Sequence, residues 1–375
     1  MKRTIGEIAE IVMGQSPKSE FYNNNGDGMP FLQGNRTFGD LYPTFDTYTT
    51  NPTKTAKAGD IIMSVRAPVG DLNITPVDMC LGRGVCALRM KNGNQSYLFY
   101  LLKHNVKTLV NRESGTVFGS VNYKDIASLV VDYEENEEEQ RRIGQFLWDI
   151  DQKIETNKAI NNNLEQQASV LVRQYCESLT SSVELGTVLS FENGFAFQSS
   201  SYHEKGKYRI ITIKNVQDGR IDAQGAACID DIPPRMKQGC FLTIGDVLLS
   251  LTGNVGRVGI VCENDLLLNQ RVAKLIPKDI RTLPLLYFYF RLPTTKISLE
   301  TISKGTAQQN LSPIETLKLE IPYETKQALE LSNLLQPIFD TIYQKNIENI
   351  QLAEIRDSLL PKLMSGELDV SDIEI

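Results

Sequence analysis

A short strand-and-turn pattern is written twice in this chain. GDIIMSVRAPVG occupies residues 59–70 and GDVLLSLTGNVG occupies residues 245–256. The Gly-Asp start, the apolar run, the serine and the Val-Gly end are shared, whereas the tip changes from Arg66-Ala67-Pro68 to Thr252-Gly253-Asn254. Gly-Asp before an apolar run, with Pro or Gly-Asn after it, is typical of a strand bounded by turns. The repeat therefore constrains the chain to two similarly built domains.

The duplication extends well beyond this stretch. Further matching segments are residues 4–6 and 184–186, 33–35 and 213–215, 81–85 and 268–272, and 113–116 and 303–306. The offset grows along the chain, as loop insertions would require. A period of about 185 residues is too long for a solenoid, so the pattern indicates a tandem duplication of a whole domain.

Each copy ends in a segment with helical periodicity. Apolar residues in 137–178 recur at alternating steps of four and three, which is a heptad seam, and copy two repeats it. Polar residues at the centre of a seam cost stability but fix its register, so we expect the two helices to pair; the alternative is that each packs only on its own domain. The predicted seam is Ile143, Leu147, Ile150, Ile154, Asn157, Asn161 and Leu164, then Leu331, Leu335, Ile338, Ile342, Lys345, Asn349 and Leu352.

These patterns predict an α+β fold of two mixed, strand-rich α/β domains in tandem repeat, separated and followed by long helices. The predicted domains are residues 1–135 and 181–322, and the helical regions are residues 136–180 and 323–375. Pro337 lies early in the second helix and is expected either to kink it or to delay its start.

Composition narrows the class of protein. The net charge of −7 argues at first against nucleic acid, but the acidic excess lies in residues 133–180 and 323–375, and the larger blocks are slightly basic. Six cysteines without a CxxC pair, and two histidines, argue against a zinc site and predict free thiols in a reducing cytoplasm. No apolar run approaches the roughly 18 residues of a membrane span.

The usual signatures of catalysis are missing from the sequence. Neither a GxxxxGK[ST] phosphate loop nor a complete GxGxxG is present. The string from Asp231 to Arg235 contains two prolines but lacks the aromatic residue that an amino-methyltransferase clamp requires. Acidic residues 134–139 could suggest a metal site, but the helix dipole alone favours acids at a helix start. We therefore predict no catalytic residues and no metal.

The remaining candidate residues lie in predicted polar loops, and their types are common in contacts with nucleic acid. Glycine N–H groups with Ser, Thr and Lys are typical phosphate partners, and Arg, Asn and Gln are the common base-reading residues. A solvated surface residue is an equally good interpretation of each one alone. The candidates are Gln15, Ser16, Lys18, Asn35, Arg36, Arg66, Arg83, Ser114, Thr116, Lys214, Asn215, Thr252, Asn254, Arg257, Gln270, Arg271, Lys304, Thr306, Gln308 and Gln309.

Several strings together resemble one family. EEQRRI at residues 138–143, FLWDID at 146–151 and LLPKLMSGELDV at 359–370 are similar to the helical regions of type I restriction-modification specificity (S) subunits. The repeated Gly-Asp element, LNQRV at 268–272 and KGTAQQNLS at 304–312 resemble their target-recognition domains. The second helix start lacks the Glu-Gln pair of the first, and the usual preceding proline occurs only at Pro322.

The resemblance implies a function that composition does not show. Each domain would read one half of an asymmetric, bipartite double-stranded DNA target, and the helices would pair as an antiparallel coiled coil that docks two modification (methyltransferase) subunits. Motor-nuclease restriction subunits would join them, and S-adenosylmethionine, ATP and magnesium would be bound by these partners and not by this chain. The alternatives are a divergent DNA methyltransferase or nuclease, and a scaffold that binds only proteins.

Overall fold

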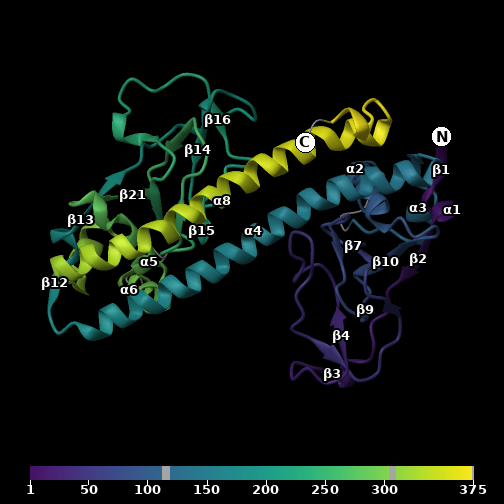
Figure 1. Cartoon of the computed structure of the whole chain (residues 1–375), viewed down its shortest axis with the longest axis horizontal. Coiled ribbons are helices and arrows are strands. Elements are labelled where there is room, and N and C mark those ends of the chain that lie inside the picture. The colour runs from purple at the N-terminus through teal and green to yellow at the C-terminus, as the bar shows by residue number, and fades with distance from the viewer. Residues whose placement is uncertain (112–118, 304–309, 374–375) are drawn as a thin grey trace. The chain divides into compact units, whose positions relative to one another are not determined.

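A computed structural model describes residues 1–111, 119–303 and 310–373 of the chain (Figure 1). The chain forms two compact units. Unit 1 comprises Met1–Glu155 with Gln351–Ile375, and unit 2 comprises Thr156–Ile350. Both boundaries fall inside long helices, so each unit contains part of each helix. We describe the units one at a time.

Unit 1 is built from two sheets and a two-stranded ribbon. The first sheet, in order β2-β10-β7-β8, is antiparallel, and the second, in order β3-β5-β4-β9-β6, contains the parallel pair β4 and β9. The strands are β1 (Lys2–Thr4), β2 (Ala9–Met13), β3 (Tyr22–Asn23), β4 (Met29–Leu32), β5 (Tyr48–Thr49), β6 (Thr55–Ala56), β7 (Ile61–Ser64), β8 (Leu72–Ile74), β9 (Met79–Leu81), β10 (Val85–Met90) and β11 (Val130–Asp132). The helices are α1 (Ile5–Ile8), α2 (Gln95–Asn111) and α3 (Tyr123–Ala127).

Unit 2 repeats this plan. Its sheets have the orders β13-β21-β18-β19-β15 and β16-β14-β20-β17, and β12 pairs with β22. The strands are β12 (Ser182–Glu184), β13 (Leu189–Asn193), β14 (Tyr208–Ile211), β15 (Gly219–Arg220), β16 (Cys228–Ile229), β17 (Phe241–Leu242), β18 (Val247–Ser250), β19 (Val258–Ile260), β20 (Leu266–Leu268), β21 (Val272–Pro277) and β22 (Glu320–Pro322). The helices are α5 (Leu283–Arg291), α6 (Pro293–Ser303) and α7 (Pro313–Leu317).

The two units share strand order at every matching position. The run β2-β10-β7-β8 corresponds to β13-β21-β18-β19, and the ribbon β1-β11 corresponds to β12-β22. The repeated Gly-Asp stretches form β7 and β18, the buried central strands of the two sheets. The predicted α+β duplication is therefore confirmed. The ribbons join the start of each domain to its end, since Lys2 pairs with Asp132 and Ser182 with Pro322.

The long helices are α4 (Glu137–Ser178) and α8 (Thr325–Ser365). Their starts have physical causes: the Asn136 side chain accepts hydrogen bonds from the N–H groups of Glu138 and Glu139, and the Glu324 carboxylate accepts from Lys326 and Gln327. Helix α8 begins before Pro337 and continues through it, so that proline does not delay the start.

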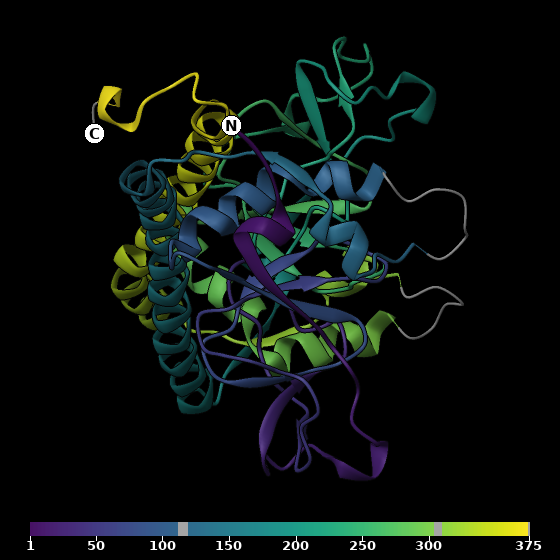
Figure 2. The ribbon, with the colours of Figure 1, turned by 90° about the vertical axis from the view of Figure 1, so that its right-hand side faces the viewer.

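Within each unit, the segments of α4 and α8 lie side by side and run in opposite directions (Figures 1 and 2). In unit 1, Asp151 of α4 contacts Arg356 of α8. In unit 2, Asn161 of α4 bonds to Asn346 of α8, and farther along α4 the hydroxyl of Tyr175 accepts from the backbone N–H of Glu324. Residue numbers that rise along α4 therefore meet falling numbers along α8, so the helix pair is antiparallel.

Each half of the helix pair packs against the core of its own unit. In unit 1, Leu147 of α4 and Leu363 of α8 belong to one buried cluster with Leu98 of α2. In unit 2, Val172 of α4 and Phe339 of α8 belong to the cluster that contains α5. Pairing and packing on the domain thus occur together. No described helix is long and apolar enough to cross a membrane.

The predicted seam residues differ in burial. Ile143, Leu147, Ile154, Asn157, Asn161, Leu335 and Ile342 are buried. Ile150, Leu164, Leu331, Ile338, Lys345, Asn349 and Leu352 are half-buried. Phe339 and Leu360, which lie one position away from the heptad series, are more buried than their seam neighbours. The buried face of α8 is therefore broader than a strict seam, because that helix also covers the domain cores.

Candidate nucleic-acid interface

The shared acid of the repeated element holds the turn before the strand. The Asp60 carboxylate accepts a hydrogen bond from the Lys57 N–H (2.8 Å) and pairs with Arg89 (Nε to Oδ1, 2.7 Å). In copy two the Asp246 carboxylate accepts from the Thr243 N–H (2.9 Å) and pairs with Lys274 (3.2 Å). The acid is preserved because it satisfies a backbone donor and a cation next to a buried strand.

The shared serine and glycine shape the tip that follows the strand. The Ser64 hydroxyl donates to the Pro68 carbonyl (2.7 Å), and the Ser250 hydroxyl donates to the Thr252 carbonyl (3.2 Å). Gly70 and Gly256 close the two tips at φ of +93° and +80°, a conformation that favours glycine. The hydroxyl partners differ, since Thr252 corresponds to Arg66 and not to Pro68. The backbone closure is shared, because the Gly70 N–H bonds to the Ser64 carbonyl and the Gly256 N–H to the Ser250 carbonyl, each at 3.0 Å.

The tip in each unit lies beside the end of a second predicted loop. Arg66 forms an isolated β-bridge with Ser120, and Thr252 forms one with Asn310. Each bridge places the tip next to a described residue, Ser120 or Asn310, that follows a predicted binding loop in the sequence. The predicted residues Ser114, Thr116, Lys304, Thr306, Gln308 and Gln309 lie outside the described residues.

A third loop joins this surface in unit 1. The Ser16 hydroxyl donates to Gln33 Oε1 (3.0 Å) and accepts from the Arg83 N–H (3.1 Å). A Cβ placed on Gly14 would lie 2.0 Å from the Gly82 carbonyl oxygen, so only glycine permits this approach. The Val65 N–H bonds to the carbonyl of Gly84, which places this cluster next to the tip.

The other predicted residues of unit 1 lie on exposed loops. Asn35 donates to Asp71 Oδ2 (2.6 Å), and Lys18 lies 3.7 Å from the Glu20 carboxylate. Gln15 donates its backbone N–H to the Leu81 carbonyl (2.9 Å). These contacts place Gln15, Ser16, Asn35 and Arg83 around one patch of unit 1.

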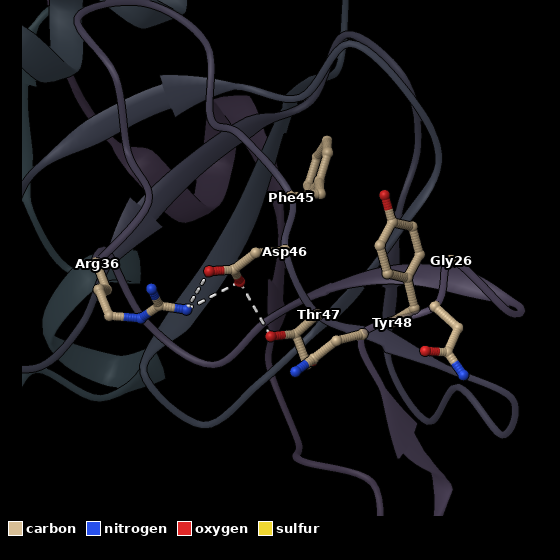
Figure 3. Close-up of a pocket in the computed structure, with 8 residues that line it drawn as sticks. Gly26, Arg36, Phe45, Asp46, Thr47 and Tyr48 are labelled. Carbon is tan, nitrogen blue, oxygen red and sulfur yellow. Dashed lines mark hydrogen bonds and ion pairs between the residues drawn. The ribbon is translucent and has the colours of Figure 1, made fainter. Parts of the chain in front are cut away.

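Arg36 lies at a separate, shallow pocket of about 570 Å³ (Figure 3). Its guanidinium donates to both carboxylate oxygens of Asp46 (2.8 and 2.7 Å), and the Thr47 hydroxyl donates to the same carboxylate. The hydrogen bonds from Arg36 hold the pKa of Asp46 below its ordinary value. Phe45 and Tyr48 form the apolar part of the lining. Arg36 is thus already engaged by an acid within its own loop.

Four predicted residues of unit 2 converge on one pocket of about 610 Å³, namely Lys214, Asn215, Gln270 and Arg271. The Leu251 N–H bonds to the Arg271 carbonyl (3.0 Å), so the pocket adjoins the tip that begins at Thr252. Asn254 is exposed on that tip. Arg257 follows the tip and donates to Gln217 (3.0 Å).

Asn215 differs from its neighbours because its side-chain amide makes hydrogen bonds within the domain. Its Oδ1 accepts from the Thr212 N–H (2.9 Å) and its Nδ2 donates to the Asp222 carbonyl (2.9 Å). The exposed side chains of Lys214, Gln270 and Arg271 have no hydrogen bond or ion pair to another described residue. Of the predicted residues at this pocket, these three have side chains that remain available for a ligand.

Sequence reasoning missed the aromatic side of this pocket. Phe197 and Tyr202 line it together with Asn269 and Gln224. The string FAFQSSSYH at residues 195–203 carried a signal, because three aromatic residues stand in an otherwise polar loop. In the structure Phe197 and Tyr202 pack on a small buried cluster and keep part of each ring exposed. Burial raises the pKa of the Tyr202 hydroxyl above its ordinary value, so this group is a neutral donor at physiological pH.

A second polar cluster lies between the helices of unit 2. Lys345 donates to Asn157 Oδ1 (3.0 Å), and Asn157 Nδ2 donates to Asn349 Oδ1 (2.9 Å). Asn161 donates to Asn346 Oδ1 (2.9 Å), while its own buried Oδ1 has no partner among the described residues. Such a layer fixes register because a shifted pairing would bury these groups without partners.

The fold defines a class of protein: a duplicated two-domain protein whose domains share a framework, differ at the tip of one repeated element, and are joined by paired helices. The chain belongs to the type I restriction-modification specificity family, since the model of the type I restriction modification DNA specificity domain matches residues 1–166 and 178–352. Members of this family are specificity subunits and not enzymes, so this chain is a non-catalytic subunit.

Curated relatives agree with this membership. The MjaIX type I restriction enzyme specificity subunit of Methanocaldococcus jannaschii is 23% identical over 99% of this chain and 94% of that protein. The HindI specificity subunit of Haemophilus influenzae is 24% identical over 84% of this chain and 88% of its own length. The MjaX specificity subunit of M. jannaschii is 36% identical, but the match spans only 44% of this chain and 42% of that protein.

A solved structure supports the fold. The S subunit of a type I restriction-modification system from M. genitalium matches with a TM-score of 0.60 and 18% identity, over 97% of this chain and 96% of its own. The duplicated plan is therefore shared at low sequence identity.

Proposed function

We propose that each recognition domain of this specificity subunit reads one half of an asymmetric, bipartite DNA target. The observation that supports this most directly is the repeated Gly-Asp element. Its acid accepts from a backbone N–H in both copies, and its last glycine donates to the serine carbonyl in both copies, while the tip between them changes. Two readers with one framework and different tips are suited to two different half-sites on one duplex.

The proposed domains are residues 1–135 and 181–322, with helical regions at 136–180 and 323–375. Arg, Gln and Asn around the tips supply the donors that read base edges in the major groove, and Ser, Lys and backbone N–H groups suit phosphates. The slightly basic recognition blocks suggest modest non-specific affinity for this chain alone, because that affinity grows with the number of neutralised phosphates.

The paired helices are proposed to dock two modification subunits, which would carry S-adenosylmethionine and the methyl-transfer chemistry. Restriction subunits would add ATP- and magnesium-dependent cleavage. Residues 133–180 and 323–375 carry a net negative charge, whereas the recognition blocks are slightly basic. A negative charge on the helices is expected if the helices bind protein and not DNA. A cytoplasmic location follows from the proposed DNA target.

Methylation sequencing tests this proposal. The chain is expressed with its modification subunit, and the methylated motif is determined from cellular DNA. We expect one bipartite motif with two unlike halves. Retention of the complex on that duplex, and not on a scrambled one, would exclude a scaffold that binds only proteins. Binding of S-adenosylmethionine by this chain alone would favour a divergent methyltransferase instead.

An exchange of tips tests the assignment of half-sites. Replacing Thr252-Gly253-Asn254 by Arg-Ala-Pro is expected to alter one half of the motif and leave the other unchanged. The reciprocal exchange at residues 66–68 is the matched control and should alter the opposite half. If both exchanges leave both halves unchanged, the tips are turns without a reading role.

A further inference from the structure

The pocket of unit 2 has a composition unlike that of an ordinary surface hollow. Phe197 and Tyr202 supply aromatic rings, and both are only half-buried, so part of each ring remains accessible. Phe195 packs edge-on against Phe197 with ring centroids 5.1 Å apart, which braces the ring that lines the pocket. Rings held in place and partly exposed offer a stacking surface for a flat ligand.

Hydrogen-bonding groups complete the lining around these rings. Gln224, Gln270 and Arg271 are exposed at the pocket, and no other described residue engages their side chains. Two amides, each a donor and an acceptor, beside a guanidinium can match the mixed donor–acceptor edge of a heterocycle. A phosphate alone would neither donate to the amide oxygens nor stack on the rings.

The pocket is continuous with the proposed reading surface. Ile213 lines it, and a Cβ added to Gly253 of the tip would lie 3.2 Å from Ile213 Cδ1. Next to Gly253, the hydroxyl of Thr252 is buried and has no hydrogen-bond partner among the described residues. DNA held at this tip would therefore have the pocket within immediate reach.

The matching region of unit 1 is closed by its own contacts. Ser16 lies in the loop that matches the Phe195–Phe197 loop, and its hydroxyl bonds to Gln33, the counterpart of Ile213. The same hydroxyl accepts from the N–H of Arg83, the counterpart of Gln270. Pro17 stands where unit 2 has Phe197. Tyr22 stands at the position of Tyr202 and donates its hydroxyl to the Pro17 carbonyl (2.9 Å), so at these two positions copy one has a single ring, which is engaged within its own loop.

We propose that this pocket of unit 2 takes one nucleobase that has left the stack of the bound duplex. The base would stack on Phe197 and Tyr202, and its polar edge would bond to Gln224, Gln270 and Arg271. A base within an intact duplex exposes only its edge, so it could not use a recessed ring, whereas an unstacked base presents both its face and its edge. This inference rests on the proposed function, because it needs DNA at the tip of unit 2.

A mismatch scan tests the proposal with the intact complex of this chain and its modification subunit. The probe is a duplex that carries the motif found by methylation sequencing. In a series of such probes, the base opposite each position of the half-site read by unit 2, here called the second half-site, is replaced in turn by a base that mispairs. Weakening a pair lowers the cost of extrusion, so binding should tighten at the captured position, by roughly tenfold, and weaken or stay unchanged elsewhere. Affinity is measured by competition at fixed salt.

The variant Phe197→Ala with Tyr202→Ala should lose that tightening at the captured position. Phe197→Tyr, which preserves the ring, should keep the tightening. Pro17→Ala in unit 1 is the matched control and should leave the second half-site unaffected. Circular dichroism and thermal melting confirm that each variant is folded.

The outcomes separate the two proposals. A complex that prefers the motif but shows no tightening at any position would overturn base capture and leave target recognition standing. Tightening that survives in the double alanine variant would also overturn it, since the base would then be held elsewhere, for example by the modification subunit. A complex with no preference for any duplex would refute the proposed function itself.

Discussion

The buried ion pair of unit 1 provides the sharpest test of how the helices are held together. Asp151 of α4 and Arg356 of α8 are in direct contact, and their side chains are only 8% and 14% exposed. The Tyr100 hydroxyl donates to Asp151 (2.6 Å), and Lys103 lies 4.0 Å from the same carboxylate. Burial and the Asp151 charge raise the pKa of Tyr100, so it remains a neutral donor.

Copy two shows what can replace this pair. At the offset that superimposes the seams, Phe339 stands in place of Asp151 and Ala168 in place of Arg356. Phe339 packs on Tyr287, the counterpart of Tyr100, with ring centroids 5.2 Å apart. The same helix crossing is thus built once from charges and once from apolar groups.

Removing one partner should cost far more than removing both. Arg356→Ala leaves a buried carboxylate and Asp151→Ala leaves a buried guanidinium, and each should lower the free energy of unfolding by about 3–5 kcal/mol. The double variant Asp151→Phe with Arg356→Ala copies unit 2 and should remain within about 2 kcal/mol of the natural chain. Tyr100 keeps its second acceptor, the Leu147 carbonyl (2.8 Å).

The chain contains its own probe for this measurement. Its single tryptophan, Trp148, packs edge-on against Phe99 and Tyr42 at 6.4 Å in unit 1. Urea unfolding of the full chain, followed by Trp148 fluorescence, reports the unit that holds the ion pair. Arg141→Ala, which removes an exposed pair on the same helix, is the control and should change little. If the double variant Asp151→Phe with Arg356→Ala loses as much stability as either single alanine variant, or more, the reasoning is wrong.

Three further predictions concern backbone packing, thiol chemistry and the connector. Gly14→Ala should destabilise unit 1 and lower the Trp148 unfolding midpoint, because its Cβ would lie 2.0 Å from a backbone oxygen. Gly34→Ala, where nothing lies within 4 Å and φ is likewise not positive, is the control and should change the midpoint little. Burial raises the pKa of the Cys86 and Cys262 thiols to about 12, so both should resist iodoacetamide at pH 8 until the chain is unfolded, as peptide mass spectrometry would show. Insertion of four residues at Asn161 should change the gap between the methylated half-sites, and an unchanged gap would refute a spacing role for the helices.

The features that could be predicted from sequence are those with local physical causes. Gly59 and Gly245 adopt positive φ, and Asp60 and Asp246 satisfy neighbouring N–H groups, so both copies had to keep these residues and the repeat stayed visible. The heptad steps likewise follow directly from helix geometry. Pro337 was ambiguous because a proline removes one backbone bond, and tertiary packing of α8 maintains the helix through it.

Other features depend on contacts between distant segments. Asp151 gives no sign in the sequence that its partner is Arg356, because a charge at a helix position is usually a solvated one. The pocket of unit 2 draws its lining from residues near 200, 213, 225 and 270, and no local pattern links these segments. Asn215 has the residue type of a base reader, yet its amide is used inside the domain.

The two-stranded ribbons have a consequence for how such a chain can change over time. Lys2 pairs with Asp132 and Ser182 pairs with Pro322, so the chain enters and leaves each domain at one place. The intervening residues could be exchanged for another version by recombination at two neighbouring joints, with the helices left untouched. A lineage could acquire a new specificity in one genetic event, without first passing through a destabilised intermediate.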